Sequence, residues 1–157
     1  MKKHTAQLLA VALAYIGISA AWAGDDGSYT AAPDDLVWKN AKALPQGAKV
    51  AMMEGDLSKA EPFTFRVKYP ANFDIPSHWH TAIEHVTVII GSFHFAEGDK
   101  LDRSKVTSIP VGGYYYIGAK HNHYAWTSEE TIIQVHGVGP WSITYVDPAD
   151  DPRNKKK

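Results

Sequence analysis

Residues 76–85 read Pro-Ser-His-Trp-His-Thr-Ala-Ile-Glu-His, and the rest of the sequence is best interpreted outward from this stretch. Side chains at positions i and i+2 of a β-strand point to the same face. On a strand, His78 and His80 therefore share a face, and Glu84 returns to that face if the chain stays extended. Two imidazoles and a carboxylate converging from one segment are three adjacent ligands for a divalent metal ion. The alternative is two histidines that fall near a glutamate by chance, and the spacing favours the metal site.

The same stretch resembles the first motif of the cupin family. That motif consists of Gly, five residues, His-x-His, three or four residues, Glu, six residues and Gly. Here His78, His80, Glu84 and Gly91 match every spacing, and Asn72 stands where the pattern has its first Gly. Asn tolerates left-handed backbone geometry better than most residues, so we still expect a turn there.

The pattern of the chain from about residue 36 onward predicts an all-β fold. Short apolar runs rich in β-branched and aromatic residues alternate with Gly, Pro, Asn and Asp, which is typical of a sandwich or barrel. The resemblance covers about residues 45–147 and implies a single-domain cupin, a double-stranded β-helix or jelly-roll barrel with the metal inside. The candidate strands are Val50–Met53, Phe63–Tyr69, Ile83–Ile90, Ser92–Ala96, Tyr114–Ile117, His123–Trp126, Thr131–His136 and Ser142–Val146.

The second cupin motif, Pro-x-Gly, two residues, His, three residues, Asn, matches more loosely. Pro110 and Gly112 fit its opening, but Tyr115 occupies the position of the histidine. Two histidines follow later, His121 and His123, and both would share a face on an extended segment. We favour His123 as the fourth metal ligand, because it opens an alternating strand, with His121 at the rim of the pocket.

The ligand set limits the cofactor to one divalent transition metal. The chain contains no cysteine, which excludes disulfides and thiolate ligands. Three histidines and one glutamate suit Fe, Mn, Ni or Zn, and the sequence does not choose among them.

Two further histidines are candidate catalytic residues. His136 lies on a late strand between apolar residues, and a side chain that faces inward could act as a general acid or base. The alternative is a histidine packed at a strand end. His121, which we expect at the rim of the pocket, is the other candidate. In the run Tyr114–Tyr116, one face must be core and the other can lend a phenol to the pocket, although barrel packing is the commoner use.

The resemblance implies a metal with open coordination positions facing the barrel mouth, as in cupin dioxygenases and lyases. The sequence therefore predicts a metal-dependent enzyme of dioxygenase or lyase type that acts on a small organic molecule. The alternative is a non-catalytic cupin that binds a metal or a small ligand, for example as a sensor. Because related ligand sets serve many reactions, the substrate is left open.

The termini predict export. Residues 1–23 combine a basic start, an apolar stretch and Ala21-Trp22-Ala23, which together are typical of a secretory signal peptide. The apolar stretch is too short to span a membrane. We therefore expect a periplasmic or secreted protein, with a flexible N-terminus at 24–35, the barrel at 36–147 and a polar tail at 148–157 that is turn-forming and then disordered.

Charge limits the partners. The 157 residues carry a formal charge of −1, and removing Lys2 and Lys3 with the leader leaves 14 basic against 17 acidic residues, or −3. This balance argues against nucleic acid, whose phosphates need a concentrated basic surface. The expected partner is a small-molecule substrate or ligand, with no membrane contact after signal cleavage. Pairing through an edge strand into a homodimer is implied by the resemblance.

Overall fold

The computed structural model describes residues 27–155, so the predicted signal peptide lies outside the described residues. The chain divides into two compact units, of which the first ends at Asp35 and the second begins at Leu36. In the first unit, residues 27–35 contain one 3-10 turn, η1 (Pro33–Asp35). Among the described residues, no helix has both the length and the apolar character to cross a membrane.

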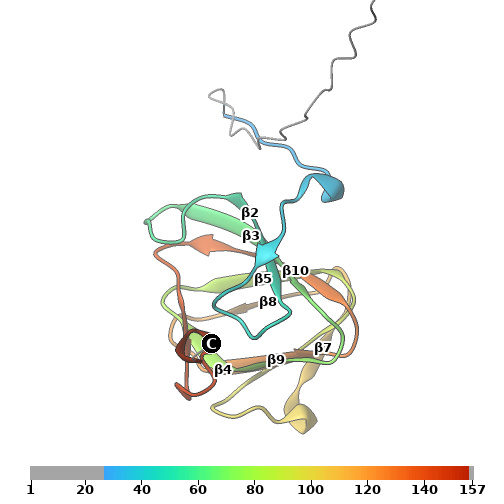
Figure 1. Cartoon of the computed structure of the whole chain (residues 1–157), viewed down its shortest axis with the longest axis vertical. Helices are drawn as coiled ribbons and strands as arrows, with labels where there is room; N and C mark the ends of the chain where they lie inside the picture. The colour runs from blue at the N-terminus through green and yellow to red at the C-terminus, as the bar shows by residue number, and fades with distance from the viewer. Residues whose placement is uncertain (1–26, 156–157) are drawn as a thin grey trace, which may run out of the picture. The chain divides into compact units, whose positions relative to one another are not determined.

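The second unit holds two antiparallel sheets that face each other, and the predicted all-β fold is confirmed (Figure 1). The larger sheet has the order β1-β2-β3-β10-β5-β8, and the smaller has the order β11-β4-β9-β6-β7. The strands are β1 (Lys39–Asn40), β2 (Lys49–Glu54), β3 (Pro62–Tyr69), β4 (Phe73–His80), β5 (Glu84–Ile90), β6 (Phe93–Glu97), β7 (Thr107–Ile109), β8 (Tyr114–Ile117), β9 (His123–Thr127), β10 (Thr131–Val138) and β11 (Ile143–Tyr145).

The core lies between the two sheets because inward positions are apolar. Along β3, buried residues alternate with residues that are more exposed, and the buried set is Phe63, Phe65, Val67 and Tyr69. These side chains pack in one cluster with residues of the smaller sheet, including Ile75 and Phe93. Full burial of one such side chain contributes about 1.5–3 kcal/mol. Burial of the apolar side chains at alternate positions is therefore the main stabilisation between the sheets.

Strand β4 is absent from the predicted set, although it carries two of the predicted ligands. Its interior contains Pro76, and proline cannot donate to a ladder, so it argues against a central strand. The pairing of β4 with β9 shifts register between Ile75 and His78. Pro76 therefore sits at an irregularity of the kind where proline is tolerated. Short strands β1 and β7 were also not predicted.

The turns at both ends of the first motif have the backbone geometry that the sequence predicts. Asn72, between β3 and β4, has a φ of 56°, so the left-handed turn expected at this Asn is confirmed. Gly91, after β5, has a φ of 75°. Asn72 is accepted because its short polar side chain tolerates the left-handed region. Gly91 must be glycine also because a Cβ there would meet neighbouring atoms.

Replacing Gly91 with alanine should lower the free energy of unfolding by more than the equivalent change at Gly112. Both glycines have positive φ, which strains any other residue, at a cost of about 1–3 kcal/mol. At Gly91 an added Cβ would also lie 2.5 Å from the carbonyl oxygen of Glu130 and 2.6 Å from Oγ1 of Thr131, whereas at Gly112 nothing lies within 4 Å. Thermal unfolding of the two variants measures the difference, and equal melting temperatures would contradict the steric argument.

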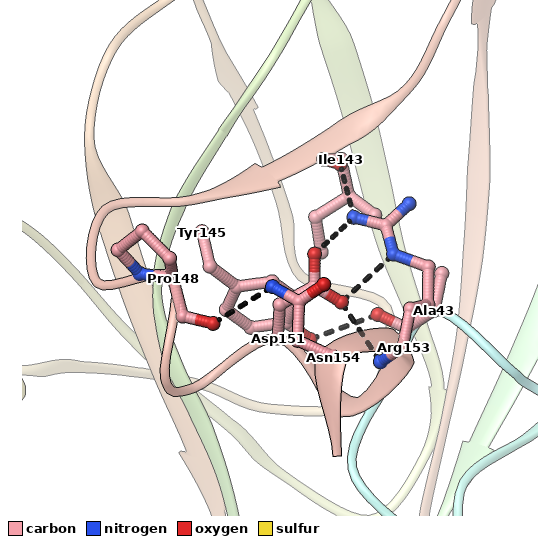
Figure 2. A network of polar contacts seen from close by, with 7 residues as sticks. All are labelled: Ala43, Ile143, Tyr145, Pro148, Asp151, Arg153 and Asn154. Carbon is pink, nitrogen blue, oxygen red and sulfur yellow. Dashed lines mark hydrogen bonds and ion pairs between the residues drawn. The ribbon is translucent and has the colours of Figure 1, made fainter. Parts of the chain in front are cut away.

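The start of the polar tail is ordered against β11. Residues 152–154 form the 3-10 turn η3 (Pro152–Asn154), capped by Asp151. Arg153 pairs with Asp151 at 2.7 Å and donates to the carbonyl oxygen of Ile143 at 3.1 Å (Figure 2). The tail forms turns as expected. The expectation of disorder after these turns is wrong as far as Asn154, because Arg153 holds this part of the tail to the carbonyl oxygen of Ile143.

Candidate metal centre

Three buried histidines converge between the sheets. His78 and His80 come from β4 and His123 from β9, and each is at most 5% exposed. The antiparallel register places His78 directly opposite His123. One nitrogen of each ring lies within 4.8 Å of the corresponding nitrogens of the other two. Of the two histidines considered for the last ligand, only His123 belongs to this cluster.

The protein backbone fixes the orientation of all three rings. Each Nδ1 lies within hydrogen-bonding distance of a backbone carbonyl oxygen, namely Pro76 for His78 (2.7 Å), Ser142 for His80 (3.1 Å) and His121 for His123 (3.0 Å). A carbonyl oxygen can only accept, so each Nδ1 carries the proton and donates. The tautomer therefore leaves a lone pair on each Nε2, which is the arrangement that metal-ligating histidines usually have.

The remaining ring nitrogens have the properties of ligands. Nε2 of His80 and Nε2 of His123 are buried and have no hydrogen-bond partner among the described residues. Burying such atoms without a partner costs free energy, which a bound metal ion would recover. Burial lowers the pKa of His78 to about 3 and that of His123 to about 4, and it holds the pKa of His80 well below its usual value. The rings are therefore neutral at pH 7, as metal binding requires.

Glu84 completes the cluster from the opposite sheet. Its Oε1 lies 3.4 Å from Nε2 of His80, and its Oε2 lies 3.7 Å from Nε2 of His123. The carboxyl group is buried, and desolvation raises its pKa to about 8. In the metal-free protein at neutral pH these contacts therefore join a protonated acid to neutral rings. They are not ion pairs, and a divalent ion would supply the charge that ionises the acid.

The expectation that Glu84 shares a strand face with His80 is wrong, although the residue does lie at the cluster. An extended chain would keep it on the face of His80. Instead the chain bends at residues 81–82, and Glu84 begins β5 in the larger sheet while His80 ends β4 in the smaller one. The carboxyl group therefore approaches His80 and His123 from the opposite sheet, and not from the strand that carries His80. Three neutral imidazoles and one carboxyl group fit a divalent transition metal.

A cavity of about 290 Å³ adjoins the cluster. His78, Glu84 and His123 are among its lining residues. Most of the wall is apolar and comes from both sheets, including Phe65, Val67, Phe93, Ile133, Val135 and Ile143. The volume is near the lower end of the range for small-molecule sites. A molecule in this cavity would therefore lie against the side chains that could hold a metal.

One side of the cavity is closed by a loop and an indole. The segment between β1 and β2, turquoise in Figure 1, supplies Ala41, Ala43 and Leu44 to the lining. The hydroxyl group of Tyr145 donates to the carbonyl oxygen of Ala43 at 2.9 Å, which ties this loop to β11 (Figure 2). The ring of Trp141 stacks on His80 with centroids 4.3 Å apart. The loop and the indole thus position the cavity wall and one ligand ring.

Both histidines proposed as catalytic residues lie outside this cavity. The side chain of His121 is 63% exposed, and its Nδ1 lies 3.8 Å from a carboxylate oxygen of Glu97. His136 follows the inward-facing Val135 on β10, so it points to the outer face, where its ring stacks on His85 with centroids 4.9 Å apart. The condition for a catalytic role, an inward-facing ring, is not met at His136.

Tyr69, Tyr115 and Trp141 line the cavity, and of these only Tyr115, in the run Tyr114–Tyr116, is a candidate for the pocket on the sequence alone. Tyr69 is the last inward residue of β3, and Tyr115 lies on β8 between two exposed tyrosines. A signal existed for Tyr115, because it occupies the histidine position of the second motif and alternates in facing with its neighbours. For Trp141, in the loop before β11, the sequence holds no comparable signal.

Comparisons with known proteins agree with this architecture. A family described as a domain of unknown function, DUF4437, matches residues 29–136. No curated protein matches the sequence at a significant level.

Solved structures resemble the chain at low sequence identity. The polyketide cyclase RemF from Streptomyces resistomycificus has a TM-score of 0.66 and 14% identity, over 80% of this chain and 90% of that chain. A protein provisionally named acetylacetone dioxygenase, from Methylibium petroleiphilum, has a TM-score of 0.61 and 16% identity, over 82% and 88%. An RmlC-like cupin protein from Ralstonia eutropha has a TM-score of 0.59 and 21% identity, over 76% and 73%. At these identities the likeness shows the fold alone, and it is the cupin fold.

Proposed function

We propose, from the premise that this chain belongs to the DUF4437 family and has the cupin fold, that it is a metal-dependent enzyme for a small organic molecule. In this proposal His78, His80, Glu84 and His123 hold one divalent ion. The observation that carries the proposal is the set of imidazole Nε2 atoms, each oriented by a backbone carbonyl, beside an apolar cavity.

The residues of the chain have separable roles in such a site. A divalent ion held there would supply Lewis acidity to an oxygen atom of a bound molecule. The backbone carbonyls hold the rings in one tautomer, so little reorganisation is needed when the ion binds. The apolar walls exclude water, which strengthens electrostatic interactions inside the cavity.

The reaction class that we propose is a dioxygenase or lyase type. The names of two structurally similar proteins, a polyketide cyclase and a provisional acetylacetone dioxygenase, support chemistry on small organic molecules in this fold. We also propose that the leader directs export to the periplasm or beyond the cell. Outside the cytosol a reaction cannot draw on reduced nicotinamide, which favours insertion of both oxygen atoms or a redox-neutral elimination.

A binding or sensor function is the second candidate, and one observation favours it. The histidines expected to act as acid and base, His121 and His136, lie away from the cavity. Among the described residues that line the cavity, the ionisable groups beyond the histidine ligands are Glu84, Tyr69, Tyr115 and, at the loop, Lys42. A protein that captures a ligand without converting it would need no further acid or base.

Elemental analysis of the untagged protein purified from its exported form tests the proposal. We expect about one equivalent of Fe, Mn, Ni or Zn per chain, and a mass that corresponds to residues 24–157. Oxygen-consumption and elimination assays over a panel of small organic molecules then separate the two candidates, since only an enzyme turns its ligand over. Absence of metal, even after reconstitution with each of the four ions, would contradict the metal-dependent enzyme and leave only the capture of a small ligand.

A further inference from the structure

Two tyrosine hydroxyls at the cavity have no partner in the described part of the chain. Tyr69 and Tyr115 both line the cavity, and Tyr69 is only 4% exposed. The other buried tyrosines are paired, because Tyr124 donates to the carbonyl oxygen of Asp102 and Tyr145 to that of Ala43. Neither hydroxyl is among the fully buried atoms that lack a partner in the described part of the chain, so both are open to the cavity. A molecule that displaces water from the cavity would therefore have to supply their hydrogen-bond partners.

The rings of these two tyrosines are held in place by other aromatic side chains. Tyr69 packs against Phe93 with ring centroids 5.9 Å apart. Tyr115 stacks on Phe95 at 4.2 Å and lies parallel to Phe93 at 6.1 Å. Because Phe93 contacts both rings, the two phenols are positioned relative to each other before any ligand binds. Such preorganisation reduces the entropy lost on binding.

Both phenols are hydrogen-bond donors at neutral pH, and both line the cavity that His78, Glu84 and His123 also line. Burial raises the pKa of Tyr69 and the pKa of Tyr115 well above the usual value, so both hydroxyls keep their protons. A ligand that occupies this cavity therefore meets both the predicted metal ligands and two neutral donors.

We propose that Tyr69 and Tyr115 are ligand-binding residues whose hydroxyls donate to an oxygen atom of the bound molecule. The inference rests on the proposed function and names its ligand class, a compact and largely apolar ring compound with at least two oxygen functions. One oxygen meets the metal position, and another accepts from the phenols. Phosphate esters and polycarboxylates are disfavoured, because such anions need several basic partners. Lys42 in the loop is the only lysine or arginine among the described lining residues.

Binding of 4-nitrocatechol, a coloured aromatic ring with adjacent oxygens, tests the inference by absorbance titration of the metal-loaded protein. Tyr69→Phe and Tyr115→Phe should each weaken binding about 2- to 10-fold, the range covered by one net hydrogen bond. Phenylalanine preserves the ring packing, so metal content should not change. Wild-type affinity in both variants would overturn the inference, and so would failure of the wild type to bind the probe.

Matched variants separate a ligand contact from a general effect. Tyr114→Phe changes the neighbour of Tyr115 on the same strand, whose side chain is exposed on the opposite face, and it should leave probe affinity unchanged. Tyr124→Phe removes a buried hydrogen bond away from the cavity and should lower stability without weakening the probe. Loss of probe affinity in either control would contradict the specific role of Tyr69 and Tyr115.

The failure of this inference can be distinguished from failure of the proposed function. Azide is a small anion that can bind a metal without reaching the phenols, so its affinity for the metal-loaded protein should be the same in Tyr69→Phe and Tyr115→Phe as in the wild type. If metal and azide bind while neither substitution changes the affinity for 4-nitrocatechol, only the phenol assignment is wrong. If the protein holds no metal, the proposed function fails, and 4-nitrocatechol titration of the metal-free protein still compares the tyrosine variants.

Discussion

Replacing His80 with alanine should abolish stoichiometric metal binding. His80 is 2% exposed, its Nδ1 is anchored to the carbonyl oxygen of Ser142, and its Nε2 has no partner among the described residues. Removing a group that only orients a ligand typically costs about 10- to 100-fold in metal affinity, so removing a ligand should cost more. His78→Ala and His123→Ala should behave alike. Titration with the metal found in the wild type, followed by elemental analysis, measures the loss.

His121→Ala and His136→Ala are the matched controls for the ligand variants. Both lie outside the cluster, one against Glu97 and the other stacked on His85, so both should retain about one equivalent of metal. A buried His→Ala change can also open a packing defect, so each variant needs a circular dichroism spectrum and a melting curve. Metal retained in His80→Ala, or metal lost from His121→Ala with its fold intact, would show that the ligands are wrongly assigned.

The metal-free protein should be most stable near pH 6.5 and lose stability in both directions. On the acid side, burial lowers the histidine pKa values from 6.5 to about 3 for His78 and about 4 for His123, and His80 shifts in the same direction. The unfolded chain therefore binds protons that the folded protein does not, and stability rises with pH up to about 6.5.

The alkaline decline comes from Glu84. Its pKa is raised from 4.5 to about 8, so the folded protein keeps a proton that the unfolded chain has lost. That contribution is fully present below pH 4.5 and is lost as pH rises towards 8. Between pH 4.5 and 6.5 it opposes the histidine effect, but three rings outweigh one carboxyl group. Above pH 6.5 the rings are neutral in both the folded and the unfolded chain, so they no longer make stability depend on pH. The effect of Glu84 remains, and stability falls.

Melting temperatures of chelator-treated protein from pH 4 to 9 measure this profile. Glu84→Gln keeps a neutral polar group at the same place and should flatten the profile between pH 6.5 and 8. Between pH 4.5 and 6.5 stability should rise more steeply than in the wild type, because the opposing effect of Glu84 is removed. Metal binding at pH 7 should release about one proton, because the bound ion favours the carboxylate. A wild-type profile that is flat from pH 6.5 to 8, or one unchanged by Glu84→Gln, would contradict the protonated state assigned to Glu84.

The strand pattern and the ligand residues of the first motif could be predicted because they depend on local properties. Alternation of apolar and polar residues depends on the pleat of a single strand, and Gly, Asn and Pro mark turns through their own backbone preferences. The left-handed turn at Asn72 is of this kind. The spacing of His78, His80, Glu84 and Gly91 is likewise a property of the chain, so it indicated a cupin before any contact was known.

The choice between His121 and His123 was settled by a backbone feature that the sequence hides. Both would share a face on an extended segment. Lys120 instead has a φ of 63°, and β9 begins only at His123, so the chain turns before the strand starts. His121 is thereby directed to the surface. A left-handed lysine is uncommon and has no recognisable pattern, which explains why spacing alone left two histidines open.

The direction of His136 and the origin of Glu84 depended on pairing between strands. Alternation along β10 places His136 on the face opposite Val135, but only the packing of Val135 in the core shows which face is inward. Glu84 reaches the cluster because two sheets pack face to face, and the unpaired phenols of Tyr69 and Tyr115 share its cavity for the same reason. The sequence by itself determined an all-β chain with a metal-ligand motif. Only the tertiary structure decided which side chains meet inside, because register and sheet packing join residues that are distant along the chain.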